Sequence, residues 1–145
     1  RLMEMLDNYE LQKKKEDTLN TKKSLVNETI ETTKLSKYEI IDRMYSGLLT
    51  ETEELKKILF EDLQVTSKAK EKAEKISKIA FALQSALDME NGGEMSEQLT
   101  WLYRFIRYMS KRIQDNDDMN YVQPAFKIIQ NLKEGWEGIP QDVRY

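Results

Sequence analysis

The side chains of this sequence offer few ways to build a catalytic or metal site. The sequence contains neither histidine nor cysteine, which removes the Ser–His and Cys–His nucleophile pairs and the usual ligands of zinc and di-iron sites. The carboxylate pairs Glu53-Glu54 and Asp117-Asp118 could hold a hard cation, but such pairs are usually solvated on the surface. An enzyme that uses only Asp, Glu, Lys or Tyr stays open, although no pattern indicates one. We therefore expect no enzyme activity, no cofactor and no metal.

The sequence does not favour binding to a nucleic acid or insertion into a membrane. The chain carries 23 Lys and Arg against 26 Asp and Glu, a net charge of −3, whereas nucleic-acid binding needs a clustered basic face. The run Lys13-Lys14-Lys15 is followed at once by Glu16-Asp17, which favours a solvated helix face. Gly92-Gly93 lacks the Lys-Ser/Thr of a phosphate loop. No apolar run reaches the roughly 18 residues that insertion into a membrane requires.

The composition predicts an all-α protein. Only 5 Gly and 2 Pro occur in 145 residues, which is too few for strands joined by tight turns. Periodic apolar residues indicate helices over about 36–62, 66–90, 96–114 and 119–136, with Ser36, Thr66 or Ser67, and Ser96 as N-caps. Asn91-Gly92-Gly93 should end the second of these. The core seam predicted for the first helix is Tyr38, Ile41, Tyr45, Leu48, Thr52, Leu55 and Leu59, and that of the second is Ala69, Ala73, Ile76, Ala80, Leu83 and Leu87. Leu132 is predicted to be a core residue of the last helix. Helices of this length with short connections pack as an antiparallel four-helix bundle.

The predicted bundle covers residues 35–140, and the ends of the chain differ from it. Residues 1–34 read as an N-terminal helical extension and linker, and residues 141–145 as a tail. Leu2, Met5, Leu6 and Tyr9 form a short apolar face that is too small to fold alone. We expect it to lie on a bundle, either its own or that of a second copy, in a site that overlaps the partner-binding groove. The alternative is a tail that is disordered or ordered only by crystal contacts.

The predicted helix over 96–114 is more apolar than a simple bundle member. Its core seam is Leu99, Leu102, Ile106, Met109 and Ile113. Trp101, Phe105 and Tyr108 form a second row, and Tyr103 is predicted near the opposite side. A helix with two apolar faces is either fully buried at the centre or exposes a docking groove for a partner helix.

Three stretches in this sequence resemble the FliS-type flagellin export chaperones. Leu35 to Leu49, with Tyr45-Ser46-Gly47-Leu48, resembles that family's opening helix; Gly92-Gly93-Glu94 with Leu102-Tyr103 resembles its Gly-Gly-Glu loop; and Leu132 to Ile139 resembles its closing Leu-Arg-Glu-Ala-Trp segment. Lys37 stands where the family usually has Pro, and Ser46 where it has Asp. The 34 residues before the bundle are also longer than the family's short tail.

The resemblance implies a cytoplasmic chaperone that binds the disordered C-terminal region of flagellin, prevents premature polymerisation and delivers flagellin to the export apparatus. The alternative is a non-enzymatic regulatory or scaffold bundle that binds another protein. Most candidate contacts lie beside the core seams, while Tyr45 lies in a seam and matches the family motif. The candidates are Ile40, Met44, Tyr45, Leu49, Trp101, Phe105 and Tyr108.

Trp136 is predicted to pack against the helix that starts at Ser36. The alternative is a Trp at the rim that anchors an oligomer, such as a homodimer. In the first case the end of the bundle is fixed to its beginning.

Overall fold

The computed structural model describes residues 35–143. Two of the residues predicted to be N-caps, Ser36 and Thr66, do cap helices in it. The hydroxyl of Ser36 accepts the N–H of Glu39 at 3.1 Å, and α4 follows over Lys37–Asp62. Thr66 accepts the N–H of Ala69 at 3.3 Å, and α5 follows over Ser67–Ser85. Each side chain satisfies one of the N–H groups that a helix start leaves without a partner. For this reason the polar residue before each apolar run correctly predicted where the helix begins.

The predicted junction between the second and third helices is wrong. α5 ends at Ser85, well before Asn91, and α6 (Gly93–Asn116) begins before the predicted cap Ser96. The Asp88 carboxylate accepts the N–H groups of Glu90 and Asn91 at 3.1 and 3.0 Å, a local turn that competes with the helix. The Ser96 hydroxyl instead donates to the Asp88 carbonyl at 2.9 Å, so it holds the loop and caps no helix.

The last helix, α7 (Val122–Glu137), is followed by a short 3-10 helix, η2 (Gln141–Val143). α7 starts three residues after the predicted Met119, and Pro124 lies in its first turn, where no N–H is needed. The predicted helical segment within residues 1–34 lies outside the described residues.

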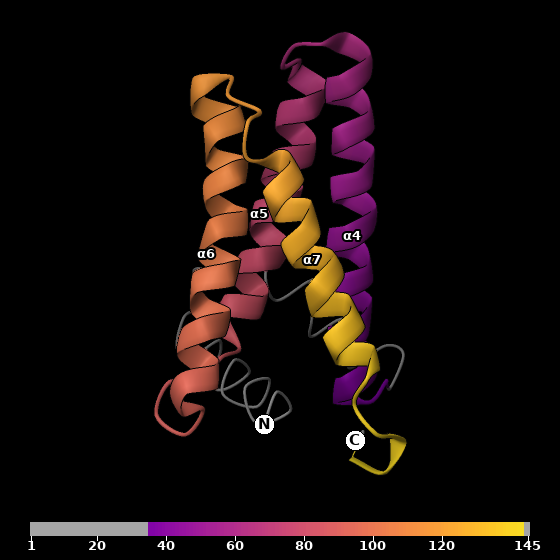
Figure 1. The fold of residues 1–145 in the computed structure, drawn as a ribbon, viewed down its shortest axis with the longest axis vertical. Helices are drawn as coiled ribbons and strands as arrows, with labels where there is room; N and C mark the ends of the chain where they lie inside the picture. Colours follow the sequence, from indigo (N-terminus) through magenta and orange to yellow (C-terminus); the bar gives the residue numbers. More distant parts are fainter. Residues whose placement is uncertain (1–34, 144–145) are drawn as a thin grey trace.

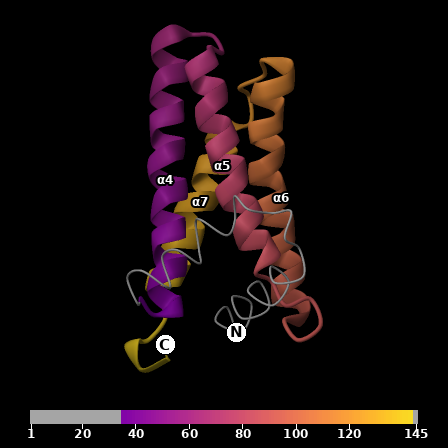
Figure 2. The same cartoon turned by 180° about the vertical axis from the view of Figure 1, so that it is seen from behind.

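The four helices alternate in direction along one axis, and α7 lies obliquely across the others (Figure 1). α5 packs against α4 and α6, while α7 packs mainly against α4 and also touches α6 (Figure 2). No strand occurs between residues 35 and 143, so this part of the chain is all-α, with four helices packed together.

The predicted seams fill the core. Leu48, Leu55, Ile76 and Ile106 are completely buried. Small residues allow α4 and α5 to approach closely: Ala69, Ala73 and Ala80 are also completely buried, and a Cβ on Gly47 would lie 3.7 Å from Ile79. The remaining predicted core residues are buried, apart from Leu132 and Leu102, which are half-buried. They are Tyr38, Ile41, Leu59, Leu83, Leu87, Leu99, Met109 and Ile113.

The position of Tyr103 differs from the one predicted from the sequence. It was predicted near the opposite side of its helix, yet it is 1% exposed, and its hydroxyl lies 2.6 Å from that of Tyr45 in the centre of the bundle. Its position, four residues after Leu99 and three before Ile106, places it in the same stripe. The two hydroxyls satisfy each other, so the core accepts both rings without an unpaired polar group.

Burial of this pair predicts a loss of stability at high pH. Burial raises the pKa of Tyr45 to about 12, although the hydrogen bond with Tyr103 reduces the rise. Burial, the nearby Tyr45 and their hydrogen bond raise the pKa of Tyr103 well above the ordinary 10.0. The contribution of both tyrosines to the stability of the folded state is therefore fully present below pH 10. As pH rises beyond 10, the unfolded chain ionises first, and the free energy of unfolding should fall by about 1.4 kcal/mol per pH unit for each.

Urea unfolding at a series of pH values above 10 measures this loss. The variant Tyr45→Phe/Tyr103→Phe is the control, because it lacks both hydroxyls but keeps every lysine that also titrates in this range. Equal pH slopes in the two proteins would contradict the prediction.

Leu63, which follows α4, adopts a backbone conformation that suits glycine. Its φ is 53°, it is 74% exposed, and its N–H donates to the Leu59 carbonyl at 2.8 Å. The left-handed conformation costs a residue with a Cβ roughly 1 kcal/mol. Leu63→Gly should therefore raise the free energy of unfolding by up to about 1 kcal/mol, partly offset by the greater entropy of the unfolded chain. Urea midpoints measure the change. Leu63→Ala keeps the Cβ, so a gain as large in that variant would contradict the strain argument.

Trp136 joins the two ends of the bundle, as predicted. Its ring is 2% exposed and stacks on Tyr38, with centroids 4.6 Å apart and planes 12° apart. The Tyr38 hydroxyl donates to the Trp136 carbonyl at 2.9 Å, and Tyr45 meets the indole edge-on. The end of α7 is thereby fixed to the start of α4.

Candidate partner-binding surfaces

The structure places the seven predicted contact residues in different environments. Trp101 and Tyr108 on α6 are 70% and 46% exposed. Leu49 and Phe105 are half-buried. Ile40, Met44 and Tyr45 on α4 are buried. The second apolar row of α6 is therefore not the covered face of a central helix, and its aromatic rings are available to a partner.

A groove of about 570 Å³ lies between α5 and α6. Phe81 and Tyr108 give it aromatic walls, and four cationic side chains line it. Trp101 lies next to it, because the Arg104 guanidinium is 5.5 Å from the centre of its ring. Tyr108 also meets Tyr121 edge-on, as does Phe105. A helix laid on this face would contact rigid rings, which lose little entropy on binding.

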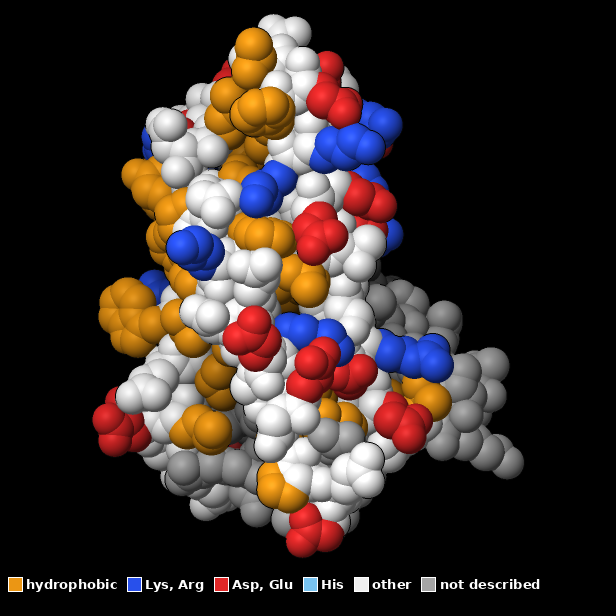
Figure 3. Space-filling model, turned by 45° about the vertical axis from the view of Figure 1, so that its right-hand side comes forward, with side chains coloured by type: hydrophobic (Ala, Val, Ile, Leu, Met, Phe, Trp, Pro, Cys, Tyr) orange, Lys and Arg blue, Asp and Glu red, His pale blue; other side chains and the backbone are white. Residues whose placement is uncertain are grey.

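A second hollow, of about 670 Å³, lies at the end of the bundle between the end of α4 and the start of α7. Phe60 is 80% exposed there, beside Leu63 and the partly exposed Met119. Figure 3 shows hydrophobic side chains gathered at the upper end of this face, with charged groups of both signs beside them. This surface was not predicted from the sequence. The position of Phe60, directly after the predicted core seam that ends at Leu59, could have indicated that its ring is exposed.

The third hollow, about 210 Å³, lies between α4 and α5 and is lined by Ile40, Met44, Gly47 and Ile79. Two of the predicted contacts therefore border an apolar depression even though little of either side chain is exposed. The depression exists because Gly47 has no side chain to fill it.

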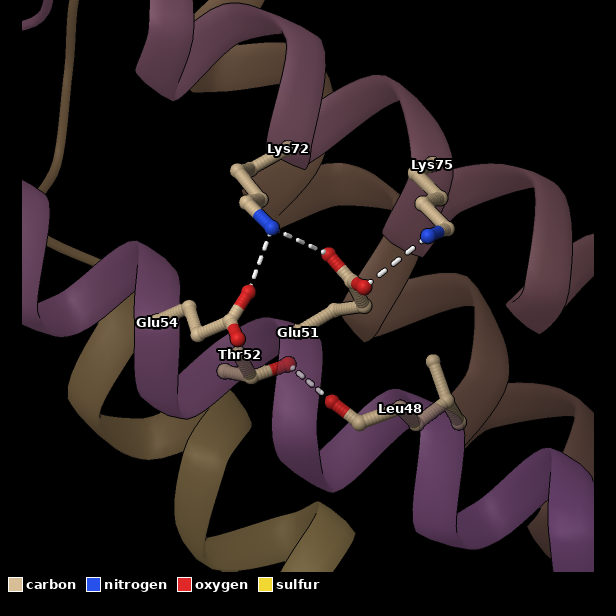
Figure 4. A network of polar contacts seen from close by, with 6 residues as sticks. All are labelled: Leu48, Glu51, Thr52, Glu54, Lys72 and Lys75. Atoms are coloured by element: carbon tan, nitrogen blue, oxygen red, sulfur yellow. Dashed lines mark hydrogen bonds and ion pairs between the residues drawn. The ribbon is translucent and has the colours of Figure 1, made fainter.

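A polar network closes one edge of this hollow. The Glu51 carboxylate of α4 lies between Lys72 and Lys75 of α5, each 3.0 Å away, and Lys72 also bonds to Glu54 (Figure 4). Burial acts to raise the pKa of Glu51, but the hydrogen bonds and charges of the two lysines outweigh it and lower that pKa. Glu51 stays ionised at neutral pH and ties α4 to α5.

Within residues 35–143 there is no cluster of acidic side chains able to hold a metal ion. None of the helices in that part of the chain is both long and apolar enough to cross a membrane.

Comparison with known proteins identifies the family of this chain. The sequence profile of the family described as "Flagellar protein FliS" matches residues 19–143, most of the chain. The chain belongs to the FliS family. This FliS-family chain is also similar to the flagellar secretion chaperone FliS of Vibrio cholerae serotype O1. The two are 30% identical over 74 residues, which are 49% of this chain and 54% of the relative, so the chain spans about half of that relative's length. No solved structure matches.

The motifs that carry the resemblance to FliS occupy positions where the fold needs them. Tyr45 bonds to Tyr103. Gly92 has no room for a side chain, since a Cβ would lie 1.7 Å from the Ser96 hydroxyl oxygen. Trp136 fills the space beside Tyr38. These motifs therefore contribute to the packing of the bundle.

Proposed function

We propose that this protein is a cytoplasmic export chaperone, and not an enzyme, that binds the disordered C-terminal region of flagellin. Binding would prevent premature polymerisation and deliver flagellin to the export apparatus. Membership of the FliS family supports the class of partner. The observation that carries the proposal is the exposed aromatic row of α6, in which Trp101 keeps 70% of its surface in solvent. Several neighbouring apolar rings on one exposed face are typical of a surface that a partner covers.

The geometry suits a segment that becomes helical as it binds. The α5–α6 groove and the α4–α5 hollow are both bounded by antiparallel helices, and an amphipathic helix can lay its apolar face along such a surface. Each Å² of apolar area that the client buries contributes about 25 cal/mol. The cost of ordering a disordered segment offsets part of this gain.

We propose direct contact for Trp101, Phe105 and Tyr108 on α6. On α4, Ile40 and Met44 would contact the client through the hollow beside Gly47, and Leu49 through its exposed part. Tyr45 stays the least accessible of the predicted contacts, since its hydroxyl bonds to Tyr103 inside the bundle; it would meet a partner only if α4 and α6 separated. In the same proposal residues 35–140 form the binding domain, and residues 1–34 are a separate extension.

Isothermal titration calorimetry with the C-terminal peptide of a flagellin from the same organism tests the proposal. We expect saturable binding, and Trp101→Ala should weaken it by about tenfold or more, as loss of an aromatic anchor typically does. Phe60→Ala is the matched control, because it also removes an exposed ring but on another face. If no heat and no chemical-shift change occur at micromolar protein, the chain is not a flagellin chaperone.

A homodimer is a second candidate assembly, and the end of the bundle favours it. We infer that Phe60 and Leu63, 80% and 74% exposed, would form its apolar centre. Lys57 and Glu61 flank them and carry opposite charges, so a two-fold axis could pair each with the other on a second copy. Light scattering after size exclusion tests this: the dimer mass should fall to that of a monomer in Phe60→Asp.

A further inference from the structure

The groove between α5 and α6 carries the opposite charge to the chain as a whole. The chain has a net charge of −3, yet the groove is lined by Lys78, Arg104, Arg107 and Lys111 against a single carboxylate, Glu74. Positive charge gathered in a concave surface attracts an anionic group more strongly than the same charge spread over a convex one.

Two of these cations pair with a carboxylate of the described residues, and two do not. Lys78 lies 3.4 Å from Glu74 and Lys111 lies 3.6 Å from Asp115, both as exposed pairs within one helix, which contribute little and exchange easily. Arg104 and Arg107 pair with no carboxylate in the part of the chain that the structure describes. They are therefore the charges that a ligand can satisfy.

Aromatic rings hold both arginines in place. The Arg104 guanidinium lies 5.5 Å from the centre of the Trp101 ring, and that of Arg107 lies 4.7 Å from the centre of Phe81. Arg107 also donates to the Gln84 side-chain oxygen at 2.9 Å. Stacking of this kind fixes the plane of a guanidinium and leaves its N–H edge free to bind a carboxylate.

Arg107 is held at a cost that a carboxylate would offset. Its Nε is buried and has no hydrogen-bond partner among residues 35–143. Burial, and then the charge of Arg104, lower the pKa of Arg107. A buried donor without an acceptor destabilises the free protein, and a second cation beside it adds repulsion. A negatively charged ligand on the exposed part of the two guanidinium groups would offset this repulsion.

The spacing of the groove residues indicates the shape of that ligand. Trp101, Arg104, Tyr108 and Lys111 follow one another along α6 at intervals of three, four and three residues. They form one stripe about 15 Å long in which aromatic and cationic side chains alternate. A single-stranded nucleic acid can also use aromatic and cationic side chains together, but the net charge of −3 and the Glu74 carboxylate in the groove disfavour it. A second helix with carboxylates and apolar residues on one face matches the alternation.

We propose that the α5–α6 groove binds an acidic amphipathic helical stretch of the client, with carboxylates on Arg104 and Arg107 and apolar side chains on Trp101 and Tyr108. The inference rests on the chaperone function proposed above and adds to it the chemical class of the bound segment. The client's apolar residues alone do not account for recognition; its charge selects this groove over the other two hollows.

The test uses two probes and two variants of the full chain. The probes are the C-terminal flagellin peptide and the same peptide with every Asp and Glu replaced by Asn and Gln. The variants are Arg104→Glu/Arg107→Glu and, as a control with the same change in net charge, Lys68→Glu/Lys127→Glu on exposed sites elsewhere. Circular dichroism melting curves of each variant show that it is folded. Arg104→Gln, at an exposed site, replaces the double variant if that one unfolds.

We expect neutralising the peptide and reversing the arginines each to weaken binding by about tenfold or more at low ionic strength, with no further loss when both are combined. The lysine control should bind as the unchanged chain does. Equal affinity for the two peptides, or an equal loss in the lysine control, would overturn this inference but leave the chaperone proposal standing. Failure of the unchanged chain to bind either peptide would remove both. Binding of a single-stranded oligonucleotide that the arginine variant alone loses, with no effect on peptide, would assign the groove to nucleic acid and overturn it as well.

Discussion

Ile106→Asp should unfold this protein, whereas Trp101→Asp, five residues earlier on the same helix, should leave it folded. Ile106 is completely buried and Trp101 is 70% exposed. An ionised or unpaired carboxyl group in the core costs several kcal/mol, which is comparable with the roughly 5–15 kcal/mol that stabilise a typical domain. Far-ultraviolet circular dichroism and size exclusion of the two variants measure the difference.

The paired variants also separate folding from binding. Trp101→Asp should keep its helical signal and melting curve but lose affinity for the client, because the ring that it removes belongs to the surface. A folded Ile106→Asp protein would contradict the packing described for α6. Unfolding of both variants would show that Trp101 supports the fold, and its role as a contact would then need another test.

Trp136→Ala should lower the free energy of unfolding by about 3–5 kcal/mol, the usual cost of removing a buried aromatic ring. The indole is 2% exposed and touches Tyr38 and Tyr45 of α4. Its loss leaves a cavity and frees the end of α7 from the start of α4. Urea unfolding followed by circular dichroism measures the change.

Two companion variants sharpen this prediction. Trp136→Phe should cost much less than Trp136→Ala, since it keeps a ring and removes an indole Nε1–H that is buried without an acceptor among the described residues. In Trp101→Phe, Trp136 is the one remaining tryptophan, so the fluorescence reports its environment alone. Emission like that of indole in water would contradict the conclusion that Trp136 fixes the end of α7 to α4. So would a decrease of less than about 1 kcal/mol in the free energy of unfolding of Trp136→Ala.

Much of the helical framework could be predicted because its signals are local. Ser36 and Thr66 cap helices within three residues of themselves, and the three-and-four spacing of apolar residues identifies the buried face of α4 and α5 without knowledge of their neighbours. The junction near Asp88 was predicted wrongly for the opposite reason. There a side chain of the loop competes with the helix, and Ser96 has the right type for a cap but bonds across the loop.

The sequence by itself determined the all-α class, the core seams of three of the four helices, the packing of Trp136 on α4, and the resemblance to FliS. Only the tertiary structure decided which apolar residues remain in solvent. Periodicity shows that α6 has surplus apolar positions, but the neighbouring helices determine that Tyr103 is covered by α4 while Trp101 is left exposed. The charge of the α5–α6 groove likewise arises from residues of two helices some 20 to 30 positions apart, such as Lys78 and Arg104. Burial and electrostatic potential depend on every element packed around a residue, so no local pattern contains them.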